Sequence, residues 1–246
     1  MDSTIIIISC IILLGGFTQG LTGFGLALVS VPLLSMTIDA KMAVPIAGIF
    51  GWIVTWPIVW KMRHHVQYRA GLILVAGSVP ASFIGAKLLA SLPSSYILVS
   101  MGVVLIISSL HSMRSSKPLF NKTSVPVTLG AGFASGVLGA SVGEAGPPVI
   151  AYTSMQPWTA DQAKSTLAFF FMLQMIGAIV SFQYEGLITA EVKHYVSWAM
   201  PAFLVGMTGG MVGYHLLQKY KINYHHIVHS LLFVIGCVLV LKNIHL

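Results

Sequence analysis

Hydrophobic residues occur along the chain in long runs separated by short polar stretches. The apolar segments cover roughly residues 4–36, 42–60, 70–90, 96–113, 124–155, 163–183, 194–217 and 225–243. A helix needs about 20 residues to cross a bilayer, and six of these segments have that length. The first and fifth are about 30 residues long, and each contains a central glycine cluster. The pattern predicts an all-α integral membrane protein with two interrupted segments.

Composition supports this class. Hydrophobic residues make up 56% of the 246 residues and charged residues only 8%, whereas a soluble domain has about 25% charged residues. The apolar segments leave no room for a separate soluble domain, and we expect the lipid bilayer, not a nucleic acid, as the surrounding partner. The net charge of +7 is typical of basic loops that are retained in the cytoplasm.

The two interrupted segments resemble each other. Residues 16–23 read GFTQGLTG and residues 132–139 read GFASGVLG, at an offset of 116. At the same offset, Pro32 matches Pro148. Such internal repeats are common in secondary transporters. We therefore predict a first transmembrane repeat over 1–113, a cytoplasmic linker over 114–123 and a second transmembrane repeat over 124–246.

The distribution of basic residues favours an inverted relation between the repeats. If the first and fifth segments enter and leave on one side, nine basic residues are cytoplasmic and four are outside. If all eight segments cross, the count is eight and five. The positive-inside rule thus favours inverted repeats by one residue, with both termini outside. The alternative with eight crossings stays open.

The segment lengths are compatible with hairpins. Residues 5–15 and 26–36 would each form about 16 Å of helix, which is half a bilayer. Each repeat would then contain one re-entrant or broken helix, and the two would meet near the midplane. Non-helical backbone is tolerated at that depth only where it is buried in protein or lines a cavity.

The two glycine-rich turns, 18–25 and 136–148, are the first candidates for chemistry. Each would expose the N–H groups at the start of the following half-helix, and these groups, with the helix dipole, suit an anion. The predicted binding residues are Gln19, Gly20, Thr22, Gly23, Phe24, Gly25, Gly136, Gly139, Ser141, Gly143, Glu144 and Gly146. The alternative is that the glycines only allow close helix packing.

Glu144 is the acidic residue expected deep in the membrane. A carboxyl group is costly there and is functional by default. Protonated Glu144 is neutral and can donate a hydrogen bond to an anion, whereas ionised Glu144 repels an anion. This predicts a proton-coupled site, with Glu144 carrying the proton.

One motif favours an enzyme instead. Residues 139–143 read GASVG, which matches the G-x-S-x-G pattern of serine nucleophiles and would make Ser141 the nucleophile. That pattern requires a strand-to-helix elbow, a histidine and an oxyanion hole. A membrane turn does not supply this context, so we predict no catalytic residue. We also expect no metal site and no cofactor, since His225 and His229 share a helix face without a carboxylate or thiol beside them.

The residues that carry these patterns resemble a known family. QGLTGFGLALVSVPLL (19–34), VPASFIGAKLLASLP (79–93), GAGFASGVLGASVGEAGPPVI (130–150) and GGMVGYHLL (209–217) are similar to the TauE/SafE family of membrane transporters. The resemblance covers nearly the whole chain. One departure is that Glu144 and Ala145 stand where many members have paired glycines.

The resemblance implies transport of a small anion, often a sulfur compound such as sulfite, thiosulfate or an organosulfonate, across the inner membrane of a bacterial or archaeal cell. It also implies that both glycine-rich turns line the substrate path. We therefore predict a multi-pass secondary transporter, with a passive anion channel and the serine hydrolase as alternatives. A second copy of the chain is a candidate partner.

Overall fold

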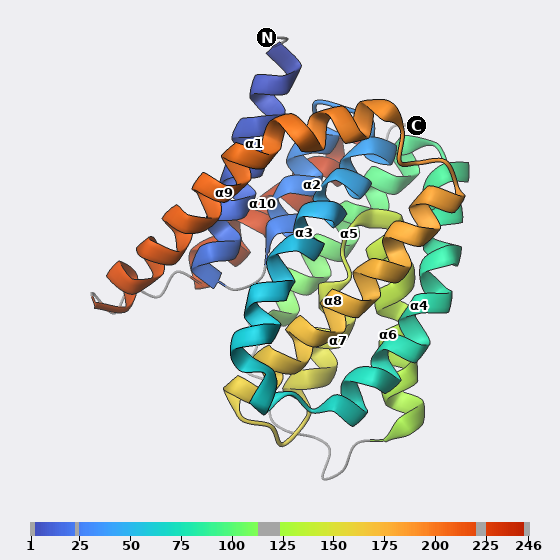
Figure 1. The fold of residues 1–246 in the computed structure, drawn as a ribbon. Helices are drawn as coiled ribbons and strands as arrows, with labels where there is room; N and C mark the ends of the chain where they lie inside the picture. The colour runs from blue at the N-terminus through green and yellow to red at the C-terminus, as the bar shows by residue number, and fades with distance from the viewer. Residues whose placement is uncertain (1–2, 23–24, 113–123, 220–224, 244–246) are drawn as a thin grey trace.

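A computed structural model describes residues 3–22, 25–112, 124–219 and 225–243. Within these ranges the chain is helical and contains no strand (Figure 1). In chain order the elements are α1 (Ser3–Thr22), α2 (Leu26–Ser35), α3 (Ala40–Met62), the short 3₁₀ helix η1 (Arg63–His65), α4 (Tyr68–Ser91), α5 (Ser94–Ser112), α6 (Val125–Val142), α7 (Gly146–Ser154), α8 (Ala160–Tyr184), α9 (Ala190–Lys219) and α10 (His225–Asn243).

Side chains cap the N-termini of two of the long helices. Asp39 precedes α3, and its Oδ1 accepts a hydrogen bond of 2.8 Å from the Lys41 N–H. Thr159 precedes α8 and forms a reciprocal capping box with Gln162. Such caps satisfy N–H groups that have no partner inside the helix. Each cap fixes the residue at which the helix starts.

Six helices are long and apolar enough to cross a membrane, by length and composition: α1, α3, α4, α6, α8 and α9. The expectation of a multi-pass, all-helical membrane protein is therefore confirmed. The set of six differs from the predicted set, because α1 and α6 qualify. The described apolar parts of α5 and α10 are shorter.

The predicted half-helix 5–15 is wrong, because α1 continues through the glycines to Thr22. The second segment behaves likewise, since α6 runs to Val142 and contains the whole 132–139 motif. The reason is tight helix packing. A Cβ on Gly20 would lie 2.4 Å from the Met207 carbonyl oxygen on α9, and one on Gly136 would lie 2.2 Å from the Ser78 carbonyl oxygen on α4. Close contact with a neighbouring helix outweighs the low helix propensity of glycine.

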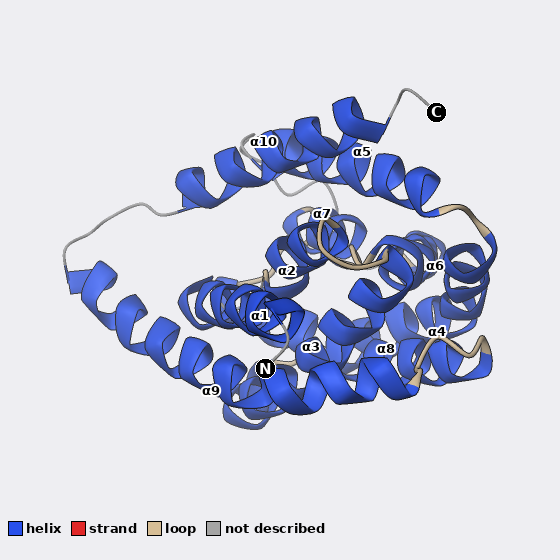
Figure 2. Cartoon of the chain, turned by 90° about the horizontal axis from the view of Figure 1, so that it is seen from above, coloured by secondary structure: helices blue, strands red, loops and turns tan. Residues whose placement is uncertain are grey.

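The helices pair across the predicted repeats. α1 packs along α9, and α6 packs along α4, so the first helix of each predicted repeat lies against the third long helix of the other. α3 packs against α8, and α5 lies beside α10 along one edge of the molecule (Figure 2). The predicted linker 114–123 lies outside the described residues, so the division into repeats remains a prediction.

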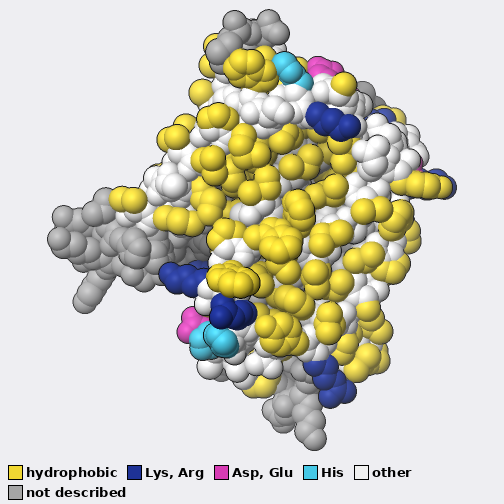
Figure 3. Space-filling model, in the orientation of Figure 1, with side chains coloured by type: hydrophobic (Ala, Val, Ile, Leu, Met, Phe, Trp, Pro, Cys, Tyr) yellow, Lys and Arg dark blue, Asp and Glu magenta, His cyan; other side chains and the backbone are white. Residues whose placement is uncertain are grey.

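Large hydrophobic side chains cover much of the outer surface. A broad apolar band spans the middle of the molecule, and charged side chains gather towards its two ends (Figure 3). Exposed members include Leu72, Ile107, Val205 and Val212, which come from three different helices. A soluble monomer rarely shows apolar patches of this extent, whereas a surface in contact with lipid requires them.

Candidate functional site

Two breaks interrupt the paired helices. The first lies between Thr22 and Leu26, where α1 ends and α2 begins, and the second lies between Val142 and Gly146, where α6 ends and α7 begins. Gly25 has φ of 111° and Gly143 has φ of 78°. Residues with a side chain rarely adopt these left-handed conformations, so glycine is required at both turns.

The first break is closed by a side chain from its own segment. The Oε1 atom of Gln19 accepts a hydrogen bond of 2.9 Å from the Leu26 N–H, the first N–H of α2. Gln19 therefore occupies part of the N-terminus that was predicted for an anion. The next two N–H groups, of Ala27 and Leu28, have no partner inside α2 by their position in the first turn.

The second break is held by contacts with α6 and α2. The Ser135 hydroxyl donates to the Ala145 carbonyl oxygen, and the Glu144 N–H donates to the Leu138 carbonyl oxygen. A Cβ on Gly143 would lie 2.8 Å from a methyl carbon of Val31 on α2. The helix that follows the first break thus packs directly against the second break.

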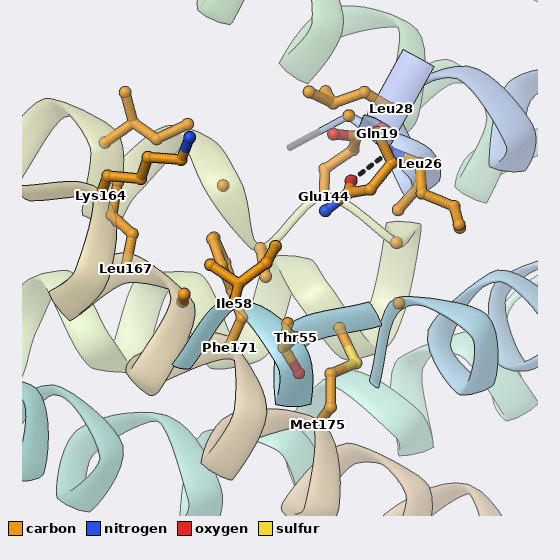
Figure 4. A pocket seen from close by; sticks show the side chains of 18 residues that line it. Gln19, Leu26, Leu28, Thr55, Ile58, Glu144, Lys164, Leu167, Phe171 and Met175 are labelled. Atoms are coloured by element: carbon orange, nitrogen blue, oxygen red, sulfur yellow. Dashed lines mark hydrogen bonds between the residues drawn. The ribbon is translucent and has the colours of Figure 1, made fainter. Parts of the chain in front are cut away.

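Both breaks line one cavity of about 300 Å³, called here the central cavity (Figure 4). Its lining comes from α1, α2, α3, α7, α8 and the two turns. The lining residues are Gln19, Gly25, Leu26, Ala27, Leu28, Gly51, Thr55, Ile58, Gly143, Glu144, Ala145, Gly146, Ile150, Lys164, Leu167, Ala168, Phe171 and Met175.

Glu144 is a buried acid in the lining of the central cavity. Its side chain is 1% exposed, and neither carboxyl oxygen has a hydrogen-bond partner among the described residues. A buried charge without a partner is strongly unfavourable. Glu144 therefore needs a proton, a water or a ligand in the central cavity to satisfy its oxygens.

Lys164 lies across the central cavity from Gln19 and Glu144, with Ile58 and Phe171 between them (Figure 4). Lys164 is on the second turn of α8 and is exposed to solvent. The central cavity therefore has a cationic, exposed end and a buried, acidic end. Two other basic residues are Lys61, in the last turn of α3, and Arg63, in η1, which contacts α8.

The predicted binding residues divide into three groups. Gln19, Gly25, Gly143, Glu144 and Gly146 line the central cavity. Gly20, Gly136, Gly139 and Ser141 do not, and the first two are helix contacts, as the packing alternative expects. Gly23 and Phe24 lie outside the described residues, as does the side chain of Thr22.

The predicted anion site at the start of α7 is incomplete. Pro147 and Pro148 follow Gly146 in the first turn of α7, and proline has no N–H group. The start of α7 therefore offers an anion fewer N–H donors than an ordinary helix N-terminus does. An anion at this turn would need further donors from side chains of the central cavity.

Ser141 does not have the surroundings of a nucleophile. It lies in the last turn of α6, and its hydroxyl donates a hydrogen bond of 2.7 Å to the Val137 carbonyl oxygen of the same helix. The G-x-S-x-G pattern requires a strand-to-helix elbow, and no strand occurs in the described ranges. The GASVG match follows from a glycine-rich helix end.

Sequence reasoning missed most of the wall of the central cavity. Lys164 enters the sequence prediction only as one of the nine basic residues counted as cytoplasmic, although a charge near the start of an apolar segment could have marked it. Ile58, Leu167, Phe171 and Met175 carry no signal in the sequence that separates them from residues facing lipid. Only the packing of α3 and α8 against both breaks identifies them.

Comparison with known proteins gives one match. The family model described as Sulfite exporter TauE/SafE matches residues 8–240, nearly the whole chain. No curated protein and no solved structure matches it. The matched range includes both breaks, the central cavity, five of the six candidate spans and most of the first span. The chain therefore belongs to the TauE/SafE family of sulfite exporters and is a multi-pass membrane protein of a transporter family.

Proposed function

We propose that this protein is a proton-coupled secondary transporter that moves a small sulfur-containing anion, such as sulfite, thiosulfate or an organosulfonate, across the cytoplasmic membrane. The central cavity carries the proposal, because residues from both breaks and one buried acid line the same space. Transporter sites are typically built where discontinuous helices meet near the midplane.

An inverted relation between the two repeats agrees with the arrangement of the helices. α3 begins near the upper end of the molecule and α8 near the lower end in Figure 1. The exchange of partners between α1–α9 and α4–α6 is what a two-fold axis in the membrane plane would produce. Alternating access would then expose the central cavity to each side in turn.

Glu144 provides the coupling in this mechanism. When ionised, it repels an anion that enters the central cavity, because the surrounding dielectric is low. When protonated, it is neutral, and this repulsion is absent. Binding of the anion and of the proton therefore favour each other, and both cross together.

Transport by the full chain in proteoliposomes tests the proposal. Sulfite uptake should be saturable and accelerated by an inward proton gradient. Glu144→Gln should abolish the dependence on the gradient, whereas Glu191→Gln, an exposed acid in the first turn of α9, should retain it. Unchanged coupling in Glu144→Gln removes the role of Glu144. Flux above carrier turnover without proton movement would instead identify a channel.

A further inference from the structure

The lining of the central cavity is mostly hydrocarbon. Of its eighteen residues, four have polar side chains, Gln19, Thr55, Glu144 and Lys164, and the others are glycine or apolar. Ligand sites are generally apolar cavities with a few polar groups that orient the ligand. The side chains that can donate to a bare oxyanion, Gln19, Thr55 and Lys164, come from three different helices, and most of the lining suits an apolar ligand body.

The volume leads to the same conclusion. One water occupies about 30 Å³ of liquid, so the central cavity at about 300 Å³ has room for several times the volume of a bare oxyanion. Sulfite alone would leave most of the apolar wall in contact with water. An organic body would displace that water and gain the free energy of apolar burial.

The polar groups are placed unequally around this wall. Lys164 is the lining residue with a cationic side chain, and it stands at the exposed end. Glu144 stands at the buried end, where an anionic group would be opposed whenever Glu144 is ionised. The favourable position for an anionic head is therefore beside Lys164.

The wall next to Lys164 continues inwards as an apolar surface. Leu167 and Phe171 follow Lys164 on α8 at helical spacing, and Ile58 faces them from α3. Residues three and four apart share one face of a helix. A ligand held by its head at Lys164 would lie with its body against this surface.

We infer that the preferred substrate is an organic anion with a hydrocarbon body, that Lys164 binds its anionic head, and that Phe171 and Ile58 select for its body. The inference rests on the proposed function and narrows its substrate class. A bare inorganic oxyanion is then a weaker ligand of the same site.

The experiment measures dissociation constants for a homologous series on the purified full chain in detergent by calorimetry. The probes are sulfite and methane-, ethane-, propane- and butanesulfonate, with butanol as the compound that lacks a head. Each added methylene should tighten binding by about fourfold until the central cavity is full. Butanol should not compete with the sulfonates. Equal or tighter binding of sulfite than of butanesulfonate overturns the inference.

Two pairs of variants test the assigned residues. Lys164→Gln should weaken the binding of all charged probes by about tenfold. Lys61 is an exposed lysine outside the lining, so Lys61→Gln should change their dissociation constants by less than about twofold at physiological salt.

Phe171→Ala should reduce the gain in affinity per methylene and leave sulfite binding unchanged. Phe169 is on the same helix but outside the lining, so Phe169→Ala should retain this gain in affinity. Ile58→Ala replaces Phe171→Ala if that variant does not give folded protein. Equal effects within either pair overturn the assignment of that residue.

The outcome separates this inference from the proposed function. Sulfite transport with a flat dependence on chain length removes the inference and leaves the transporter in place. Absence of transport for every anion removes the proposed function, whatever the binding series shows.

Discussion

Both breaks join two helices through a glycine with positive φ, but the polar side chains beside the two glycines differ in their hydrogen bonding. In the first, the left-handed glycine, Gly25, stands at the start of the second helix, and Gln19 caps that helix. In the second, the left-handed glycine, Gly143, stands at the end of α6, and the carboxyl oxygens of the next residue, the buried Glu144, have no hydrogen-bond partner in the described part of the chain. The polar side chain of the first break is hydrogen-bonded within its own segment, whereas the acidic side chain of the second break is available to a proton or ligand. Similar sequence therefore does not imply equal roles.

The strongest test of the comparison concerns the helix contacts that the two segments share. Gly20→Ala and Gly136→Ala should both greatly reduce the yield of folded protein, because each new Cβ would meet a backbone carbonyl oxygen at 2.4 Å or 2.2 Å. Overpacking costs about 1–3 kcal/mol, and more against backbone. Fluorescence-detected gel filtration in detergent measures the loss.

Gly130→Ala is the matched control for this pair. Gly130 is also in α6, but a Cβ there would have no atom within 4 Å. Alanine should raise helix stability by about 0.5–1 kcal/mol at such a position. Equal loss of folded protein in Gly130→Ala and Gly136→Ala would show that packing against α4 is not the cause.

The second test concerns the turn that carries Glu144. Gly143→Ala should lower the thermal midpoint, since the left-handed conformation costs about 1–2 kcal/mol with a side chain and the Cβ would also meet Val31. Adding Val31→Ala should recover the part that comes from the contact. Full recovery would mean that the backbone conformation contributes nothing.

The third test removes the cap that distinguishes the first break. Gln19→Leu should lower the thermal midpoint by an amount equivalent to about 1 kcal/mol, because the Leu26 N–H loses its acceptor in a buried place. Gln19→Glu keeps an acceptor oxygen and serves as the control for the loss of the bond. A midpoint for Gln19→Leu equal to that of the unaltered protein would show that water replaces the cap.

The smallest effect on stability is expected for Glu144, the residue on which the proposed proton coupling depends. Glu144→Gln should leave the thermal midpoint unchanged or raise it slightly, since an amide costs less to bury than a carboxylate without a partner. A marked fall, measured in the same scan as Gln19→Leu, would show that Glu144 has a structural bond in the folded protein. The side chain of Glu144 would then be hydrogen-bonded within the protein, as the side chain of Gln19 is at the first break.

The sequence was sufficient for several of the long helices and for the region of the breaks. Apolar length predicted α3, α4 and α8 to within a few residues, and the rarity of acids in apolar segments identified Glu144. The glycine motifs were misread, because a glycine in a turn and a glycine under a neighbouring helix look alike in a single sequence. Gly20 and Gly143 differ only in their surroundings. Lys164 and Phe171 were missed since their importance depends on which face of α8 meets the breaks.

The pairing of α1 with α9 has a consequence for how the protein is made. The ribosome completes α1 at Thr22, yet Ala190, where α9 begins, is 168 residues further along the chain. The glycine-containing face of α1 is therefore not covered by α9 through most of synthesis. α6 follows the end of α4 after only 34 residues, from Ser91 to Val125, so its glycine face is covered early. During synthesis, α4 can therefore pair with α6 early, whereas α1 can pair with α9 only late. Until then α1 is available to a chaperone or a membrane protease.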